Sequence, residues 1–230
     1  MSLYFKLLLL SVAVPLVLSF DKRLQFYKKW RFVFPSILMV AAVYIAFDVF
    51  LTQKGVWGFN PAYLSRIYIF NLPIEEVLFF LAIPYASLFL HYSFVEYFPA
   101  VKLNDNWNKI ITVSLLIVCV ILIIFNTGKS YTLYIFSKLL LVLVFSLFDK
   151  TRVIQSFYIT FLIILIPFIL VNGILTGTGI VSEVVWYNNQ ENLGIRFFTI
   201  PVEDFGYAFS MILYNLLIIS NLEKYYKPVE

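Results

Sequence analysis

The chain alternates long apolar runs with short polar segments, and the runs have the length of membrane-spanning helices. About 20 helical residues cross the roughly 30 Å hydrocarbon core of a bilayer. We expect seven such crossings, all helical, with a few polar residues between consecutive spans. The predicted spans are 2–20, 32–51, 67–95, 110–127, 131–148, 153–176 and 199–221.

The third run, 67–95, is too long for one straight helix, because it would measure about 43 Å at roughly 1.5 Å per residue. It also contains Asn71-Leu72-Pro73, and proline fits the first turn of a helix but not its interior. We therefore predict a non-helical, membrane-embedded lead-in at 67–72 and a helix over 73–95. Irregular backbone at that depth is tolerated only against protein or a cavity.

Composition excludes the soluble classes of protein. Residues of the set AVILMFWYC make up 62% of the chain and charged residues only 13%, whereas soluble domains have roughly 45–50% apolar and about 25% charged residues. A mean hydropathy of +0.90 leaves too few polar side chains to cover a water-facing surface. A soluble enzyme, a nucleic-acid-binding protein and a disordered tail are excluded. With no long polar linker, we expect one all-α transmembrane domain over 1–230.

The basic residues are unevenly distributed between the two sides that seven spans would define. The loops 21–31, 96–109 and 149–152 and the tail 222–230 share one side and hold 11 of the 17 Lys and Arg residues. The loops of the opposite side hold four. The positive-inside rule therefore predicts a cell-membrane protein with a cytoplasmic C-terminus and an outside N-terminus.

No cofactor motif is present. The sequence has no Gly-x-Gly-x-x-Gly, Walker A, Cys-x-x-Cys or His-Glu-x-x-His pattern. The single cysteine, Cys119, and the single histidine, His91, have no partner at metal-ligand spacing. We expect neither a metal nor a nucleotide or flavin cofactor.

The sequence also contains an internal repeat. Repeat 1 covers 1–95, repeat 2 covers 131–221, and the span 110–127 connects them. Because matching spans are four crossings apart, the repeats run parallel, related by a pseudo-twofold axis along the membrane normal. The matched features are Phe20-Asp21-Lys22 with Phe148-Asp149-Lys150, Leu51-Thr52 with Leu175-Thr176, Asn60 with Asn188, and Leu72-Pro73-Ile74-Glu75-Glu76 with Ile200-Pro201-Val202-Glu203-Asp204.

Each repeat places two adjacent acids at the start of an apolar helix: Glu75 and Glu76, then Glu203 and Asp204. An intramembrane carboxylate costs at least about 2.5–3.5 kcal/mol. Neighbouring side chains lie about 100° apart on a helix, so at most one acid of a pair points straight into a shared cavity. Helix N-terminal amides favour the ionised form, while burial and the neighbouring charge favour the neutral form. We expect burial to dominate, so that each pair supplies an acid beside a base. The alternative is that the acids merely cap the helices.

Several neighbours of the acids are candidate site residues. Asn60 and Asn188 either orient the acids or form turns, and Pro73 and Pro201 support the helix starts. Asp48, whose counterpart is Asn172, is equally compatible with interfacial solvation and with participation. Aromatic faces can stabilise a carbocation by about 2 kcal/mol each when desolvated, and no basic residue is placed to bind an anion, so we expect a neutral, apolar substrate from the bilayer. The candidate substrate-binding residues are Trp57, Phe79, Phe80, Trp186, Phe205 and Tyr207.

These motifs resemble those of the flavin-independent lycopene cyclase family. Pro-Ile-Glu-Glu-Val-Leu-Phe-Phe at 73–80, preceded by Gly-Val-Trp-Gly-Phe-Asn-Pro at 55–61, is similar to the first half of that family. Gly-Ile-Arg-Phe-Phe at 194–198, followed by Ile-Pro-Val-Glu-Asp-Phe at 200–205, is similar to its second half. The family occurs as two small membrane subunits or as one fused chain, and this chain resembles the fused form over essentially its whole length.

The resemblance implies cyclisation of the ψ-end groups of lycopene to β-rings without net redox change. An acid protonates the terminal double bond, the next double bond attacks the cation, and a base removes a ring proton. It implies catalytic roles for Glu75, Glu76, Glu203 and Asp204, and leaves open which one donates and which one accepts. The implied partners are lycopene and membrane lipids, with association with other carotenoid enzymes or with a second copy left open.

Three other functions remain to be weighed. A proton-coupled transporter of a small apolar substrate would also use repeats and midplane acids. A retinal protein would need a Schiff-base lysine in the last span, and 199–221 has none; Lys138 is expected to snorkel or to be paired. A carotenoid end-group hydratase would use the same cation, quenched by water.

Overall fold

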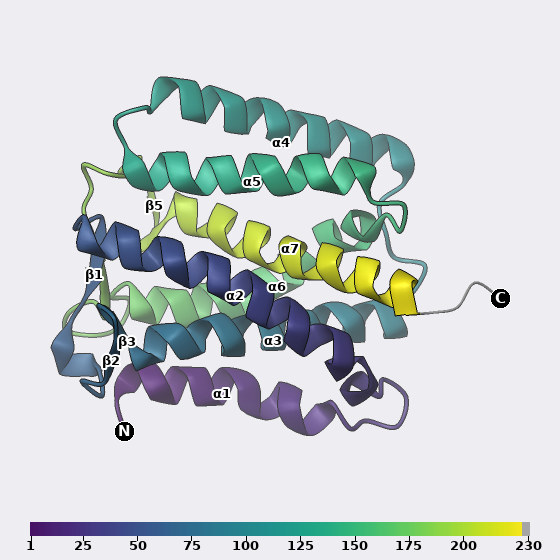
Figure 1. Cartoon of the computed structure of the whole chain (residues 1–230), viewed down its shortest axis with the longest axis horizontal. Helices are drawn as coiled ribbons and strands as arrows, with labels where there is room; N and C mark the ends of the chain where they lie inside the picture. The colour runs from purple at the N-terminus through teal and green to yellow at the C-terminus, as the bar shows by residue number, and fades with distance from the viewer. Residues whose placement is uncertain (227–230) are drawn as a thin grey trace.

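The computed structural model describes residues 1–226, in which seven α-helices lie side by side (Figure 1). Lys227, part of the predicted basic tail, lies outside the described residues. The N-terminus and the end of the last helix are at opposite ends of the bundle, as an odd number of crossings requires (Figure 1). The helices are α1 Leu3–Leu18, α2 Trp30–Gln53, α3 Ile74–Tyr97, α4 Asp105–Phe125, α5 Ser130–Phe148, α6 Val153–Leu175 and α7 Val202–Tyr226.

The prediction of an all-α membrane bundle is confirmed. Helices α2 to α7 are long and apolar enough to cross a bilayer. Helix α1 has 16 residues and measures about 24 Å at roughly 1.5 Å per residue, so it is shorter than the predicted span 2–20. It begins after Ser2, whose hydroxyl accepts the N–H of Phe5 at 3.2 Å, which is an N-cap.

The predicted non-helical lead-in before the third helix is confirmed, and it is a β-hairpin. Strand β2 (Tyr68–Ile69) pairs antiparallel with β3 (Leu72–Pro73), and α3 starts at the next residue. The first turn residue, Phe70, has a φ of 55°, a left-handed conformation that is costly for a bulky side chain.

The same hairpin recurs in repeat 2. Strand β5 (Arg196–Phe197) pairs with β6 (Ile200–Pro201), and Phe198 at the turn has a φ of 54°. Helix α7 therefore begins later than the predicted 199, because Ile200 and Pro201 belong to the hairpin. Helix α4 begins earlier than the predicted 110, because Asn104 caps it by accepting the N–H of Trp107 at 2.9 Å.

The parallel internal repeat is confirmed in three dimensions. Equivalent positions in the two hairpins and acidic pairs differ by 128 in number, as Glu75 and Glu203 do. Strand β1 (Trp57–Phe59) pairs antiparallel with β4 (Val185–Tyr187), with Gly58 opposite Trp186. When each residue is replaced by its counterpart in the other repeat, the same residue pairs result. Contacts across the twofold axis of a symmetric dimer have this property. The pseudo-twofold axis therefore passes through the β1–β4 pair.

Packing follows the same symmetry. Helix α1 packs on α3 as α5 packs on α7, and the repeats meet where α2 contacts α7 and α3 contacts α6. Helix α4 lies outside α5 (Figure 1) and buries only Thr112 and Cys119 fully. It is the predicted connector.

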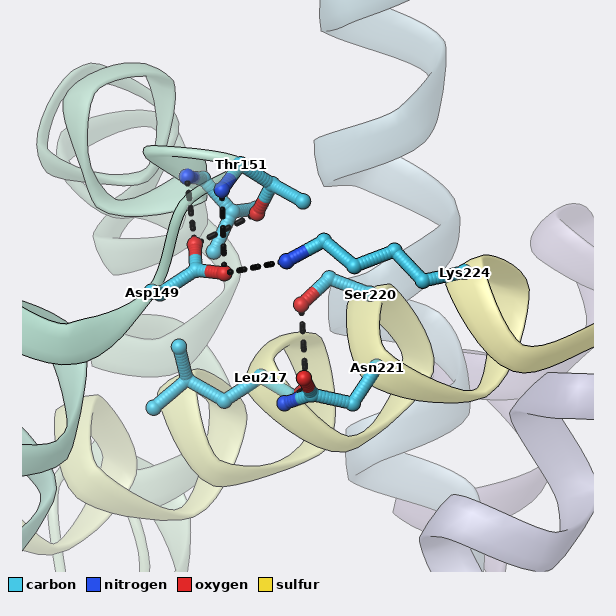
Figure 2. A network of polar contacts seen from close by, with 7 residues as sticks. Asp149, Thr151, Leu217, Ser220, Asn221 and Lys224 are labelled. Atoms are coloured by element: carbon cyan, nitrogen blue, oxygen red, sulfur yellow. Dashed lines mark hydrogen bonds and ion pairs between the residues drawn. The ribbon is translucent and has the colours of Figure 1, made fainter. Parts of the chain in front are cut away.

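The Phe-Asp-Lys motif has a capping role at the end of the bundle away from the hairpins. Asp149 accepts the N–H groups of Thr151 and Val153 at 3.1 and 3.2 Å, and lies 3.5 Å from the Lys224 amine of α7 (Figure 2). Burial acts to raise the pKa of Asp149, but these donors and Lys224 outweigh it and hold the pKa below its usual value. Asp21, its counterpart, accepts the N–H groups of two residues that follow it, both at 2.9 Å. The motif fixes turns and lies outside the site described next.

Candidate active site

A small cavity lies between the repeats, close to the starts of α3 and α7. Its volume is about 60 Å³. Strands β1 and β4 and six of the seven helices contribute to its wall, so residues far apart in sequence meet there. The residues that line it are Tyr4, Asp48, Trp57, Glu76, Phe79, Ile83, Tyr131, Phe168, Asn172, Leu175, Val185, Tyr187, Asp204, Tyr207, Ala208 and Met211.

The four predicted acids divide into two kinds. Glu76 and Asp204, here called the cavity acids, line the cavity. Glu75 and Glu203, the outer acids, do not, as expected for neighbouring side chains about 100° apart on a helix. All four are buried, with at most 8% of each side chain exposed.

The outer acids make the same contacts in both repeats. Oε1 of Glu75 accepts the hydroxyl of Ser2 and the N–H of Ser65, both at 2.6 Å. Oε1 of Glu203 accepts the hydroxyl of Thr132 at 2.8 Å and the N–H of Leu193 at 2.7 Å. Ser65 and Leu193 are equivalent positions. Each outer acid thus ties the loop before its hairpin and the first helix of its repeat to the start of α3 or α7.

The cavity acid of repeat 2 accepts hydrogen bonds from three donors. The Tyr131 hydroxyl donates to Oδ1 of Asp204, and Asn172 Nδ2 and the Tyr187 hydroxyl donate to Oδ2 at 2.8 and 3.0 Å. Burial and the neighbouring Asp204 raise the pKa of Tyr187, a residue of β4, above its usual range, so its phenol keeps its proton. Three donors on one carboxyl group favour the ionised form.

The cavity acid of repeat 1 has one donor. The Tyr4 hydroxyl donates to Oε2 of Glu76 at 2.6 Å, and within residues 1–226 no donor reaches Oε1. At the positions equivalent to Tyr187 and Asn172, repeat 1 has Phe59, which has no donor, and Asp48, a second acid. The pseudo-symmetric site therefore holds two chemically unlike carboxyl groups.

A third carboxyl group and a lysine lie beside these acids. Asp48 is 1% exposed and accepts the Tyr207 hydroxyl at 3.1 Å, so it is not solvated at the interface. Lys138 is 9% exposed, and its amine lies 3.1 Å from the ring centroid of Tyr44 and 3.8 Å from that of Tyr134. Contrary to expectation, Lys138 neither snorkels nor pairs with a carboxylate in the described part of the chain. Aromatic faces surround it.

Of the predicted aromatic residues, some line the cavity and others do not. Trp57, Phe79 and Tyr207 line the cavity. Phe80 does not, because it is packed in a separate cluster of α2, α3 and α7. Trp186 does not, because it stands over Gly58 on the pseudo-twofold axis and is 39% exposed. Phe205 does not line the cavity, but its ring contacts that of Phe168, which does.

The predicted supporting residues stabilise the chain around the acids. Asn60 accepts the N–H of Ala62 at 3.1 Å, and Asn188 accepts the N–H of Gln190 at 3.1 Å, so both form turns and neither orients an acid. Pro73 and Pro201 end the hairpins directly before α3 and α7.

Sequence reasoning missed the tyrosines that donate to the cavity acids. Tyr4 and Tyr131 lie at the starts of α1 and α5, the first helices of the two repeats. Both helix starts carry a serine and a tyrosine, Ser2 and Tyr4 in repeat 1 and Ser130 and Tyr131 in repeat 2. A comparison of the polar residues of the two repeats at these positions would have identified the tyrosines. Tyr187 carried no such signal, since its counterpart is a phenylalanine.

The comparisons with known proteins show the family to which the chain belongs. A family model described as lycopene cyclase matches residues 1–95 and 128–222, ranges that contain both repeats and all four acids and omit α4. No curated protein and no solved structure matched the chain. The match covers most of the chain and follows its repeats. The protein therefore belongs to the lycopene cyclase family, as a membrane enzyme of the fused two-repeat form.

Proposed function

We propose that the protein converts the ψ-end groups of lycopene to β-rings inside the bilayer, without net redox change. One observation carries the proposal: the cavity acids, one from each repeat, are buried and share one cavity but differ in their donors. The substrate is neutral and apolar, and it comes from the surrounding lipid.

The unequal hydrogen bonding divides the roles between the two cavity acids. Glu76 has one donor and a free oxygen, so burial keeps its proton, and it is the acid. Asp204 has three donors, so it is ionised, and it is the base. This assignment follows the rule that donors stabilise a carboxylate, while a desolvated carboxyl group with few donors stays neutral.

The reaction conserves atoms and electrons. Glu76 gives its proton to the terminal carbon–carbon double bond, which leaves a tertiary cation. The next double bond of the end group attacks that cation, so a ring bond forms and the positive charge moves into the ring. Asp204 takes a ring proton, and the electrons of that C–H bond form the ring double bond. One proton enters and one leaves, and returning it from Asp204 to Glu76 completes the cycle.

The lining favours this charge development. Trp57, Phe79 and Tyr207 present aromatic groups to the cavity, and each face stabilises a desolvated cation by about 2 kcal/mol. The outer acids Glu75 and Glu203 hold the loops and first helices in place and do not exchange protons with the substrate.

Substitution of the cavity acids in a lycopene-accumulating host tests the proposal. Glu76→Gln and Asp204→Asn should each lower cyclisation by about 10²–10⁴-fold, the usual contribution of a general acid or base. The control is Glu183→Gln, an exposed carboxyl of the loop before β4. Pigment extracts containing full β-ring product from both cavity variants would contradict the assignment. A hydroxylated acyclic product from the wild type would favour a hydratase, and proton flux without conversion would favour a transporter.

Deuterium labelling separates the acid from the base. In D₂O, the Asp204→Asn variant should still protonate lycopene reversibly, so the recovered acyclic pigment gains deuterium. The Glu76→Gln variant should return unlabelled lycopene. The reverse pattern would mean that the two roles are exchanged.

We also propose that the C-terminus is cytoplasmic. The support is the excess of Lys and Arg in the loops at that end of the bundle. The orientation is checked by fusing, after the last residue, a reporter that is active only in the cytoplasm. A well-expressed but inactive fusion would place the C-terminus on the outside.

A further inference from the structure

A series of four aromatic rings connects the cavity wall with the outer surface of repeat 2. Phe168 of α6 lines the cavity, and its ring centroid lies 5.1 Å from that of Phe205 of α7. Phe205 lies 6.0 Å from Phe197 of β5, and Phe197 lies 4.8 Å from Phe198 at the hairpin turn. All three contacts are edge-to-face. We call these four residues the aromatic ladder.

The ladder passes from a half-buried to an exposed environment. Phe168 and Phe205 are half-buried, Phe197 is 45% exposed, and Phe198 is 76% exposed. Strand β5 turns its two side chains in opposite directions, as strands do. The Arg196 guanidinium donates to the Thr199 carbonyl at 2.7 Å and to Asn189 Oδ1 at 2.8 Å, while Phe197 packs toward α7.

Repeat 1 has no equivalent of the ladder. The positions matching Phe197 and Phe205 are Ile69 and Val77. The turn residue is the same in both repeats, since Phe70 matches Phe198 and is 83% exposed. The counterpart of Phe168 is Tyr44, whose ring packs against Phe80 and Tyr207 and is not part of such a series. Pseudo-symmetry therefore does not explain the ladder, and neither does the hairpin itself, which both repeats possess.

The cavity is much shorter than the proposed substrate, and this difference indicates a role for the aromatic ladder. The cavity, at about 60 Å³, is bounded by the side chains that line it, and Phe205, Phe197 and Phe198 are not among them. A forty-carbon polyene is about as long as the roughly 30 Å hydrocarbon core, so it extends far beyond the cavity. The conjugated chain must lie outside the cavity while its end reacts.

We propose that the aromatic ladder is the binding track of the polyene chain: it receives a long conjugated hydrocarbon from the lipid at Phe198 and guides its end past Phe168 to the cavity acids. The inference rests on the proposed function, because it requires a polyene substrate. The ring faces and edges contact the conjugated chain along its length, and Phe168 is the ring of the ladder that lines the cavity. The substrate enters through repeat 2, on the side of the base Asp204.

Kinetics in proteoliposomes test the track, with the mole fraction of lycopene in the lipid as the substrate concentration. Phe205→Leu and Phe198→Leu keep an apolar side chain but remove a ring. Each should raise KM by about three- to tenfold, the effect of losing an aromatic contact, with kcat within about twofold. The matched control is Phe70→Leu, which alters the same turn position in repeat 1 and should leave both constants unchanged.

The outcomes separate the track from the function. An active wild type with unchanged KM in both ladder variants would overturn the track and leave the cyclase proposal standing. An equal rise of KM in Phe70→Leu, or a fall of kcat alone, would also overturn it. Absence of any cyclised product from the folded wild type would instead overturn the proposed function. Phe198→Leu keeps the test valid if Phe205→Leu misfolds, since the Phe198 ring is largely exposed.

Discussion

Replacing the outer acid Glu203 distinguishes a positioning role from a chemical one. In the structure, Oε1 of Glu203 accepts the Thr132 hydroxyl at 2.8 Å and the Leu193 N–H at 2.7 Å, and the side chain does not line the cavity. Glu203→Leu fills similar space but leaves both donors without an acceptor. Glu203→Gln keeps an oxygen at the same place and removes only the ionisable proton.

The magnitudes follow from those two hydrogen bonds. A buried donor left without a partner costs about 1–3 kcal/mol, and Leu193 is only half-buried, so Glu203→Leu should lose about 3 kcal/mol of unfolding free energy. In a chain of this size, each kcal/mol shifts Tm by about 2–4 °C, so Tm should fall by about 6–12 °C. Glu203→Gln should remain within about 3 °C of the wild type and keep cyclase turnover within tenfold.

The assay is thermal unfolding of the detergent-solubilised protein, combined with pigment analysis of the same variants. Glu75→Leu and Glu75→Gln are the matched variants of repeat 1, where Ser2 and Ser65 make the equivalent contacts, and they should behave in the same way. A Glu203→Gln protein with normal Tm and no cyclised product would refute the reasoning, because the carboxyl proton itself would then be needed for the reaction.

Two further predictions concern the strand pair on the pseudo-twofold axis and the start of α5. A Cβ at Gly58 would lie 2.3 Å from Cζ2 of Trp186, so Gly58→Ala should displace the indole, change its fluorescence and cost about 1–3 kcal/mol of stability. Gly128→Ala is the control and should not destabilise the protein, because nothing lies within 4 Å of its Cβ. Equal Tm values for the two variants would disprove the clash. Glu191 accepts the N–H of Ser130 at 2.9 Å with its side chain, which lowers its pKa. Gln keeps an oxygen acceptor, so Glu191→Gln should cost only the favourable effect of a negative charge at the start of α5, about 0.3–1 kcal/mol at pH 7. Because the folded pKa lies below the unfolded value of about 4.3, that difference should be complete above pH 4.3 and disappear as the pH falls through the folded pKa; a difference that stays constant down to pH 3 in chemical unfolding curves would contradict the capping role.

Much of the architecture was predictable because its causes are local. Apolar runs long enough to span a bilayer become helices whatever their neighbours, since unpaired backbone groups are too costly in lipid. Pro73 and Pro201 mark where the non-helical hairpins end and α3 and α7 begin. The recurrence of the acidic pairs at one spacing revealed the repeat.

The chemistry of the site was decided only by the tertiary structure, because it depends on which side chains converge from distant segments. The sequence showed four acids, and the fold turned Glu76 and Asp204 into the cavity while Glu75 and Glu203 bind loops. The donors Tyr4 and Tyr131 reach the acids from α1 and α5, more than 70 positions away in the chain. Phe80 and Trp186 matched the aromatic pattern as well as Phe79 did, but packing directed them elsewhere. Helix periodicity limits how many side chains can share one face, and only the arrangement of the helices determines what that face meets.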